Sequence, residues 1–441
     1  MRSVLSATLF VFATLILGCT TNKQIRVGDG DCSYHIDEHC EDNYIISDSS
    51  SDPNGYSYTL SFVEFDEQGH FQDRNQLNNV IEHVNKQGDE QDIILFIHGW
   101  HHGVEDKDSN VVDFRNAMRK LSKRNPTRTV TGIYVGWRGD SISIPIVNKV
   151  TFWDRKKVSI EIGQGAVTEL LNRLEHISEV KDKTRLIAIG HSFGGSVLFS
   201  ATKNKFYNDL LEQYNEKSEE KSALNKEHHF RDIYILVNPA IENIQYAPLN
   251  DLVNEMSAEF PDIFLPSSPP NLTVFMSEGD WATGIVFPIG RFFGTLLENQ
   301  NPIVRKNRFG QEVSYSQFSM DLKALGHYEP FITHSLTSVA SEGDASYCQG
   351  EPKMLDIPIV NTGPHDTKSN YTGRSENWTM NFLSSKTKLN HLGNSPAFSP
   401  IWVVKTDKKV IKDHNAIFGD QFSCYLEELM LVNTPQTNLQ R

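Results

Sequence analysis

One pentapeptide of this 441-residue chain has the residue types and spacing of a serine nucleophile. It reads Gly190-His191-Ser192-Phe193-Gly194, it follows a buried strand expected at residues 185–189, and a helix is expected to continue from Gly195. Such a strand–turn–helix holds the serine in a strained turn, and the close backbone approach there leaves no room for side chains at Gly190 and Gly194. The first N–H groups of the helix then point toward the serine oxygen and any developing oxyanion. The pattern predicts nucleophilic catalysis by Ser192. The alternative interpretation is a glycine-rich turn before a helix, with no catalytic role.

The elements that must position this serine alternate between strand and helix. Short apolar runs, typical of strands buried on both faces, are separated by segments with helical spacing. This alternation predicts an α/β protein with a doubly wound, mostly parallel sheet, in which chemistry is found at the carboxyl ends of the strands. Expected strands are residues 58–65, 92–97, 130–135, 185–189, 232–237, 272–276 and 401–404, and expected helices are 76–84, 110–121, 158–180 and 418–431. Two segments are additions to such a minimal fold. The charged stretch at 203–232 is expected to form an exposed helical excursion. The long insertion at 281–399 is expected to hold its own helices and strands and to cover the site.

On these residues the chain resembles the α/β-hydrolase superfamily, and more narrowly a group of largely uncharacterised bacterial and fungal α/β-hydrolase proteins. The resemblance implies one α/β-hydrolase domain over residues 57–441, with insertions at 203–232 and 281–399. It also implies hydrolysis through an acyl-serine intermediate by a Ser-His-Asp triad, with no cofactor and no metal. The stretches that carry it are residues 96–100, 134–139, 151–156, 190–195, 237–240, 277–283, 287–291 and 326–328.

In this superfamily a His-Gly pair at the end of an early strand begins the oxyanion loop. The matching stretch here is Phe96-Ile97-His98-Gly99-Trp100, so the backbone N–H groups of Trp100 and Phe193 are expected to form the oxyanion hole. His98 is expected to tie the loop rather than to move protons. A metal site is a weaker alternative, and its ligands would be His101, His102, Glu105, Asp106 and Asp108.

The base and the acid should follow the serine in the order acid, then histidine. His414 comes after the last expected strand and before the last helix, so it is the predicted base; His327 and His334 lie in the long insertion and are weaker. Asp280 follows the strand 272–276 and a glycine turn, which predicts that its carboxylate orients the imidazole. Glu278 and Glu242 are the competing acids, and Asp413 is expected to be only a cap.

The N-terminus predicts export. An apolar run at residues 4–17 ends in Ile16-Leu17-Gly18-Cys19, which resembles the lipobox of bacterial lipoproteins. The resemblance implies a signal peptide at residues 1–18 and acylation of Cys19, which would anchor the protein to a membrane of the bacterial cell envelope, with a lean toward the outer membrane. An ordinary secretory signal and a plain membrane anchor are the alternatives. Residues 19–56, with a polar tract at 42–56, are expected to act as a linker.

Without Cys19, four cysteines remain, an even number that suits disulfides in an oxidising compartment. Cys32 and Cys40 form the natural local pair, which leaves Cys348 with Cys424, although three pairings are open. Zinc held by the cysteines and histidines of residues 32–40 is a minor alternative.

The sequence thus favours a serine hydrolase, a carboxylesterase or lipase-like enzyme that acts on a small-molecule or lipid ester near a membrane. A transacylase differs only in what intercepts the acyl-enzyme. The alternative from another class is a lipid-anchored envelope binding protein on an inactive hydrolase scaffold. A net charge of -14 argues against a nucleic-acid partner, since counterion release needs a basic surface.

Overall fold

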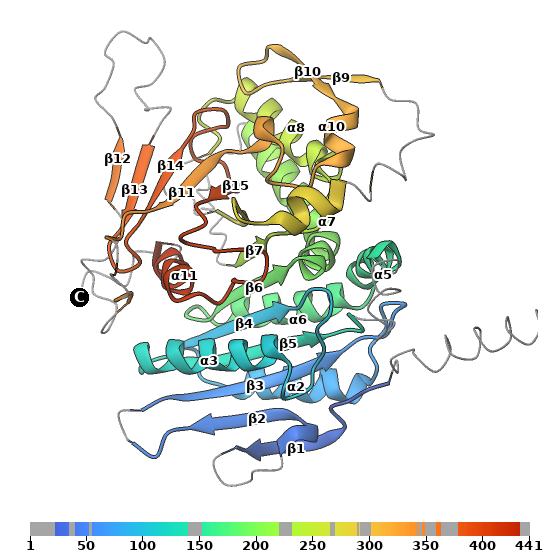
Figure 1. Ribbon diagram of the computed structural model, residues 1–441, viewed down its shortest axis with the longest axis vertical. Coiled ribbons are helices and arrows are strands. Elements are labelled where there is room, and N and C mark those ends of the chain that lie inside the picture. Colours follow the sequence, from blue (N-terminus) through green and yellow to red (C-terminus); the bar gives the residue numbers. More distant parts are fainter. Residues whose placement is uncertain are drawn as a thin grey trace, which may run out of the picture.

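A single sheet of 13 strands organises the molecule (Figure 1). The structure, a computed structural model, describes residues 23–34, 40–52, 55–139, 152–219, 232–264, 270–288, 291, 301–341, 343, 346–348, 359–362 and 378–432. In spatial order the strands are β1 (Gly28–Ser33), β2 (Asn43–Ser49), β3 (Ser57–Glu64), β5 (Thr129–Gly136), β4 (Gln91–Ile97), β6 (Arg185–His191), β7 (Ile233–Val237), β8 (Leu272–Ser277), β15 (Ile401–Thr406), β11 (His334–Ser338), β14 (Thr387–His391), β13 (Trp378–Phe382) and β12 (Ile359–Thr362). From β3 to β11 all neighbours are parallel, which confirms the expected mostly parallel α/β sheet.

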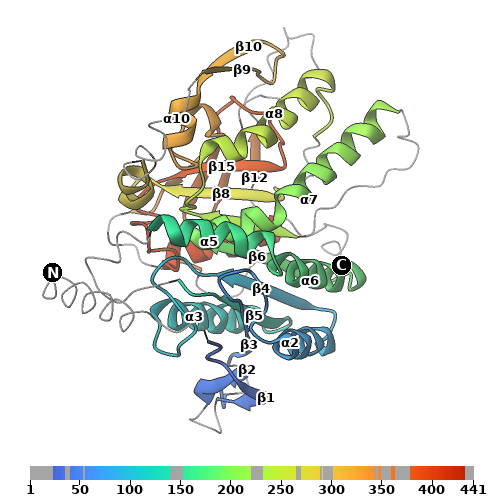
Figure 2. The same cartoon turned by 90° about the vertical axis from the view of Figure 1, so that its right-hand side faces the viewer.

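Helices cover both faces of this sheet (Figures 1 and 2). On one face lie α3 (Ser109–Arg124) and α11 (Asp420–Val432); on the other lie α2 (Arg74–Lys86), α6 (Val167–Val180) and α7 (Phe193–Ser218), with α5 (Phe152–Gln164) and α8 (Asn243–Glu259) packed on α7. In α3 the buried residues Val111, Phe114, Met118 and Leu121 recur at helical spacing, and the Asp108 carboxylate caps the first turn by accepting from the Asn110 N–H. The burial of these apolar faces against the sheet fixes the strands whose ends carry the site.

The single helix expected at 158–180 is instead two helices, α5 and α6. The backbone of Gly69 approaches the break closely, and its carbonyl accepts a hydrogen bond from the Ala166 N–H (2.8 Å). A Cβ on Gly165 would lie 2.5 Å from that carbonyl oxygen. The first part of the charged stretch at 203–232 is helical, as expected, and continues α7 to Ser218. It is not fully exposed, because Phe206 and Leu210 are buried and the Tyr214 ring lies 5.6 Å from the ring of Phe260. Residues 220–231 lie outside the described part.

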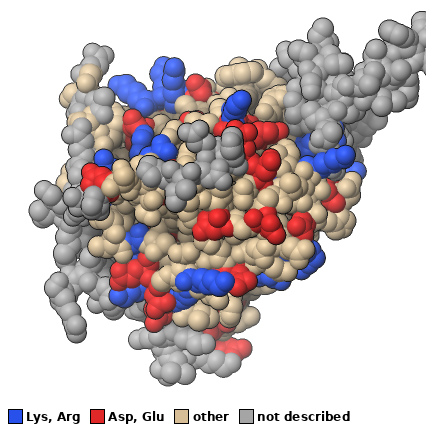
Figure 3. Space-filling model, turned by 90° about the horizontal axis from the view of Figure 1, so that it is seen from below, with Lys and Arg blue, Asp and Glu red and all other residues tan. Residues whose placement is uncertain are grey.

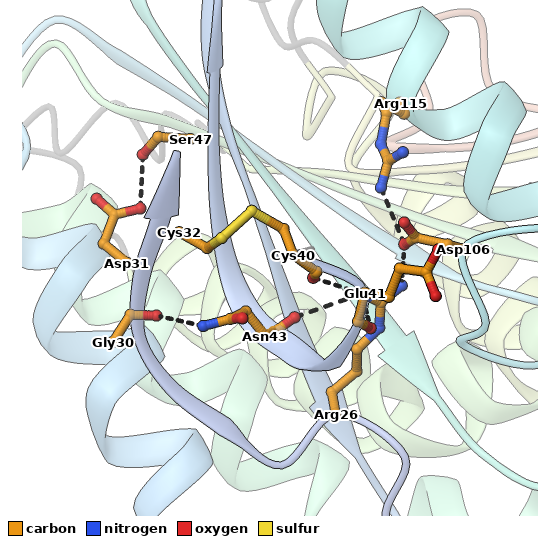
Figure 4. Close-up of a disulfide and its surroundings, with 10 residues drawn as sticks. All are labelled: Arg26, Gly30, Asp31, Cys32, Cys40, Glu41, Asn43, Ser47, Asp106 and Arg115. Atoms are coloured by element: carbon orange, nitrogen blue, oxygen red, sulfur yellow. Dashed lines mark hydrogen bonds and ion pairs between the residues drawn. A yellow bond between two sulfur atoms is a disulfide. The ribbon is translucent and has the colours of Figure 1, made fainter. Parts of the chain in front are cut away.

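The expectation of a linker at 19–56 is wrong for two parts of it. Residues 28–33 form β1 and residues 43–49 form β2, which pair with each other and join the sheet at β3. The Cys32–Cys40 disulfide closes the loop between β1 and β2 (Figure 4). Arg26 is fully buried beneath this loop, and its guanidinium donates to the carbonyl of Glu41 (2.5 Å) and contacts Asp106 (2.5 Å). The polar composition of these strands did not predict them. In β2, Tyr44, Ile45 and Ile46 are buried, and so is Asp48, which is paired with Arg119.

The long insertion holds its own elements, as expected. It contributes the π-helical turn η3 (Ala282–Val286), the hairpin of β9 (Pro302–Lys306) and β10 (Glu312–Ser316), and the short helix α10 (Gln317–Leu322). It then returns to the sheet as β11 and adds the antiparallel strands β14, β13 and β12 at that edge. A second disulfide, Cys348–Cys424, joins the insertion to α11, so both expected pairings are present.

Two observations concern the surface and the helices. On the face seen in Figure 3, lysine and arginine side chains are interspersed with acidic ones. Within the described ranges, no helix is both long and apolar enough to cross a bilayer. The predicted signal peptide and Cys19 lie outside the described residues.

Candidate active site

The site lies at the point in the sheet where the order of the strands reverses. The chain goes from β4 outward to β5, then crosses back to β6 on the other side of β4, so the carboxyl ends of β4 and β6 border a topological switch point, where ligands of such sheets bind. The loop with Gly99 follows β4, and Ser192 follows β6. Asp280 comes after β8, and His414 after β15, its parallel neighbour. Parallel strands thus bring four distant segments to one edge.

Ser192 sits in the strained turn that its sequence predicts. Its φ is 55° and its ψ is −116°, a conformation that L-residues rarely adopt. Its carbonyl accepts from Gly195 and Ala240 N–H, both at 3.1 Å, and these bonds hold the turn. A Cβ on Gly194 would lie 2.1 Å from the Ile97 carbonyl oxygen, so only glycine fits where the turn crosses β4.

Ser192, His414 and Asp280 form one hydrogen-bonded chain. His414 Nε2 lies 3.0 Å from Ser192 Oγ, and His414 Nδ1 lies 2.9 Å from Asp280 Oδ1. Ser192 is buried to 7% exposure, and the Asp280 side chain is fully buried. Burial alone would raise the pKa of Asp280, but hydrogen bonds from His414 and Thr283 outweigh it and hold this pKa below its usual value. A carboxylate at Asp280 fixes the imidazole with its proton on Nδ1, which leaves Nε2 free to accept the serine proton.

The loop after β4 lies directly against Ser192. A Cβ on Gly99 would be 3.0 Å from the Ser192 Cβ, and the rings of Trp100 and Phe193 are 6.1 Å apart. His98 ties this loop, as expected: its Nε2 accepts from the Trp137 N–H (3.2 Å), so its Nδ1 carries the proton donated to the Gly99 carbonyl (2.8 Å). Complete burial lowers the pKa of His98 to about 4, which keeps it neutral. The Trp100 and Phe193 N–H groups stay the predicted oxyanion donors.

Two residues that hold the His414 loop were not predicted for that role. Asn238, directly after β7 with φ of 47°, donates from Nδ2 to the His414 carbonyl (3.0 Å) and accepts the Ser277 N–H at Oδ1 (2.8 Å). His191 Nε2 donates to the same carbonyl (2.8 Å), and burial, with His414 nearby, lowers the pKa of His191 to about 3. The only sequence signal was position, because each is a polar residue at the carboxyl end of a buried strand.

The acid has its own support. Asp280 Oδ1 also accepts the N–H groups of Ala282 (2.9 Å) and Thr283 (3.1 Å), and Oδ2 accepts the Thr283 hydroxyl. The Thr283 oxygen in turn lies 2.8 Å from His327 Nε2. Because that hydroxyl donates to Asp280, His327 Nε2 must carry a proton and donate to it. His327 therefore stands behind the acid and not beside the serine.

The remaining competitors are engaged elsewhere. Buried Glu242 is ion-paired with Lys156, and Glu278 is half exposed and 4.0 Å from Lys405. His334 is fully buried, with Nδ1 2.7 Å from the Thr333 hydroxyl. Asp413 caps the following turn by accepting the Asn415 N–H (3.0 Å), as expected.

The alternative metal sites find no support in the arrangement of their ligands. Cys32 and Cys40 are joined in a disulfide, so they offer no thiolates to zinc. Of the loop residues after β4, His102 pairs with Asp108 (3.1 Å) and Asp106 with Arg26. Among the residues that the structure describes, no three or more His, Cys, Asp or Glu side chains gather in a way that could hold a metal ion.

Comparison of the chain with models of protein families, with curated proteins and with solved structures found no match.

Proposed function

We propose that this protein is a serine hydrolase that cleaves an ester through an acyl-serine intermediate, a carboxylesterase or lipase-like enzyme. The single observation that carries the proposal is the hydrogen-bonded chain from Ser192 through His414 to buried Asp280. The strained serine and its tight glycines add to it, because such strain is found where a nucleophile must be presented.

In the proposed reaction, Ser192 Oγ attacks the ester carbonyl carbon while its proton passes to His414 Nε2. Asp280 stabilises the imidazolium that forms, and the N–H groups of Trp100 and Phe193 would bind the carbonyl oxygen as it becomes an oxyanion. The tetrahedral intermediate collapses, and His414 returns the proton to the leaving alkoxide, which departs as the alcohol. Water then attacks the acyl-serine, giving its proton to His414, and the carboxylic acid leaves with Ser192 restored.

We further propose an α/β-hydrolase fold and a place in the bacterial cell envelope. Support for the fold is the order of functions along the sheet: the proposed oxyanion loop after β4, the nucleophile after β6, the acid after β8 and the base after β15. Support for the location is the pair of disulfides, which persist in oxidising compartments, together with the Cys19 lipobox.

The test is covalent labelling of the whole protein with a fluorophosphonate, mapped by mass spectrometry, with hydrolysis of p-nitrophenyl butyrate measured in parallel. One adduct on Ser192, and loss of both labelling and turnover in Ser192→Ala, are expected. Ser196→Ala is the matched control, since Ser196 is buried one helical turn away and bonds the Ala240 carbonyl (2.8 Å). Equal turnover by wild type and Ser192→Ala would refute the proposal. A wild type that neither labels nor hydrolyses would favour an inactive, binding role instead.

A further inference from the structure

The N-terminal end of the described chain is fastened near the carboxyl ends of the parallel strands, the side of the sheet on which Ser192 lies. We call this side the catalytic edge. Glu64, the last residue of β3, accepts the N–H groups of Ile25 (2.9 Å) and Arg26 (2.8 Å). The Arg26 guanidinium donates to the carbonyl of Val104, in the loop that follows β4, at 2.9 and 2.7 Å. Lys23 and Ile25 line a cavity of about 190 Å³ together with that loop. Because β3, β4 and β6 are parallel, the chain toward Cys19 leaves from the same edge as Ser192.

The distance to the predicted lipid attachment point is short. Cys19 precedes Lys23 by four residues, and extended chain spans at most ~3.5 Å per residue, or ~14 Å in all. Arg26 fixes this exit firmly, because freeing its buried guanidinium would strand several carbonyl partners. With Cys19 acylated, the bilayer surface must therefore lie close to the β3 side of the catalytic edge.

Exposed apolar side chains lie on the other side of the same edge. After β8 and the catalytic acid, the turn of η3 exposes Trp281 (61%), Ile285 (59%) and Val286 (40%). Val27, beside the anchor exit, is 62% exposed. Tryptophan and aliphatic side chains exposed together suit the interfacial region of a membrane. In the sheet order β3-β5-β4-β6-β7-β8, Ser192 follows β6, between these two flanks.

We propose that the carboxyl edge of the sheet faces the bilayer that carries the Cys19 anchor, with Trp281 and Ile285 in the membrane interface. Ser192 then opens toward the bilayer, and its substrates are esters of lipids in that same membrane. This inference rests on the proposed hydrolase function and on acylation of Cys19. The net charge of -14 gives no attraction to anionic lipid, so the anchor and the apolar contacts hold the orientation.

Tryptophan quenching tests the orientation. The full chain with its acyl anchor is reconstituted in vesicles of phosphatidylethanolamine and phosphatidylglycerol, with and without brominated acyl chains. Trp281 is the one tryptophan found among the exposed large apolar residues of the described part, so brominated lipid should quench wild type more than Trp281→Phe. The matched control is Trp281→Phe combined with Val180→Trp, because Val180 is 68% exposed at the end of α6, at the opposite edge.

The control should be quenched no more than Trp281→Phe alone. Equal quenching of wild type and Trp281→Phe, stronger quenching of the control, or a full chain that does not associate with the vesicles would each overturn the orientation.

Activity gives an independent readout. Ile285→Gln should lower hydrolysis of a long-chain ester dissolved in the vesicles by about three- to tenfold, and leave hydrolysis of soluble p-nitrophenyl butyrate unchanged. Val180→Gln should change neither rate. Equal rates on the vesicle ester for Ile285→Gln and wild type would count against the orientation. If wild type hydrolyses neither ester, the proposed function fails, while the quenching result still decides which edge meets the membrane.

Discussion

Asp280→Asn separates the two things that the acid does for His414: orient it and stabilise its charge. Asp280 Oδ1 accepts the backbone N–H groups of Ala282 (2.9 Å) and Thr283 (3.1 Å) besides His414 Nδ1. An amide nitrogen cannot accept these bonds, so the asparagine oxygen must occupy the Oδ1 position. His414 Nδ1–H then keeps its acceptor, and the tautomer needed for catalysis is retained. The negative charge is lost, and with it the acceptor that Oδ2 offers to the Thr283 hydroxyl.

The size of that loss follows from Coulomb's law. Two unit charges roughly 4 Å apart attract by about 4 kcal/mol at an effective dielectric constant of 20, which corresponds to about a 1000-fold change in rate. The assay is the second-order rate constant of fluorophosphonate labelling at pH 8, followed by intact mass, because it needs no knowledge of the natural ester. A fall of about 10,000-fold would mean instead that the asparagine turned its NH₂ toward His414 and forced the wrong tautomer.

Asp413→Asn is the matched control. Asp413 is adjacent to His414 in the chain, but its carboxylate only caps the next turn (3.0 Å to the Asn415 N–H), and asparagine can cap equally well. Its labelling rate should equal that of wild type. A loss of less than tenfold for Asp280→Asn would refute the assignment of Asp280 as the charged partner of the base.

Three further predictions concern the support of the site and the stability of the fold. In Gly194→Ala the new Cβ would lie 2.1 Å from a carbonyl oxygen of β4, so this variant should melt at a much lower temperature or fail to fold. Gly88→Ala is the control, because a Cβ there would have no atom within 4 Å. Equal melting temperatures of the two variants would contradict the packing of the turn. Thr283→Val removes the hydrogen bond from the Thr283 hydroxyl to Asp280. It should slow fluorophosphonate labelling about tenfold, since a hydrogen bond to a charged group is worth about 1.5–3 kcal/mol. Thr283→Ser should retain the labelling rate, and a valine variant as fast as wild type would show that the bond is dispensable. Burial, with Glu175 nearby, raises the pKa of Asp232 to about 7, so the native state holds a proton that the unfolded chain releases near pH 4, and the free energy of unfolding should fall as pH rises from about 4 to 7. Between urea melts at pH 5 and pH 8, Asp232→Asn should remove about 3 kcal/mol of this fall, since about two pH units at roughly 1.4 kcal/mol each lie in that range. An unchanged fall would exclude Asp232 as its source.

The sequence predicted much of the candidate site because its members follow strands. Ser192, Asp280 and His414 each come shortly after an apolar run, and the carboxyl ends of parallel strands meet at one edge. His98 was likewise predicted to tie its loop, and its two ring hydrogen bonds confirm that. These predictions needed only the order of the elements, which local hydrophobic patterns encode.

The sequence misplaced the edges of the sheet. The tract 42–56 has the composition of a linker, yet part of it is β2, because pairing with β3 and burial of two isoleucines outweigh its polarity. The long insertion gave no sign that β11 joins β15 as a parallel neighbour. Edge strands carry weak periodicity, and their partners lie far along the chain, so local pattern cannot assign them.

By itself, then, the sequence determined the type of sheet, the candidate nucleophile Ser192 and the segments that supply its hydrogen-bond partners, because these depend on residue type and on the order of strands. Only the tertiary structure decided among residues of the same type. Asp280 rather than Glu242 meets His414 because Glu242 is already paired with Lys156, and His327 stands behind the acid because Thr283 lies between them. Such choices depend on distances of a few ångströms between segments more than a hundred residues apart in some cases, and those distances are set by packing.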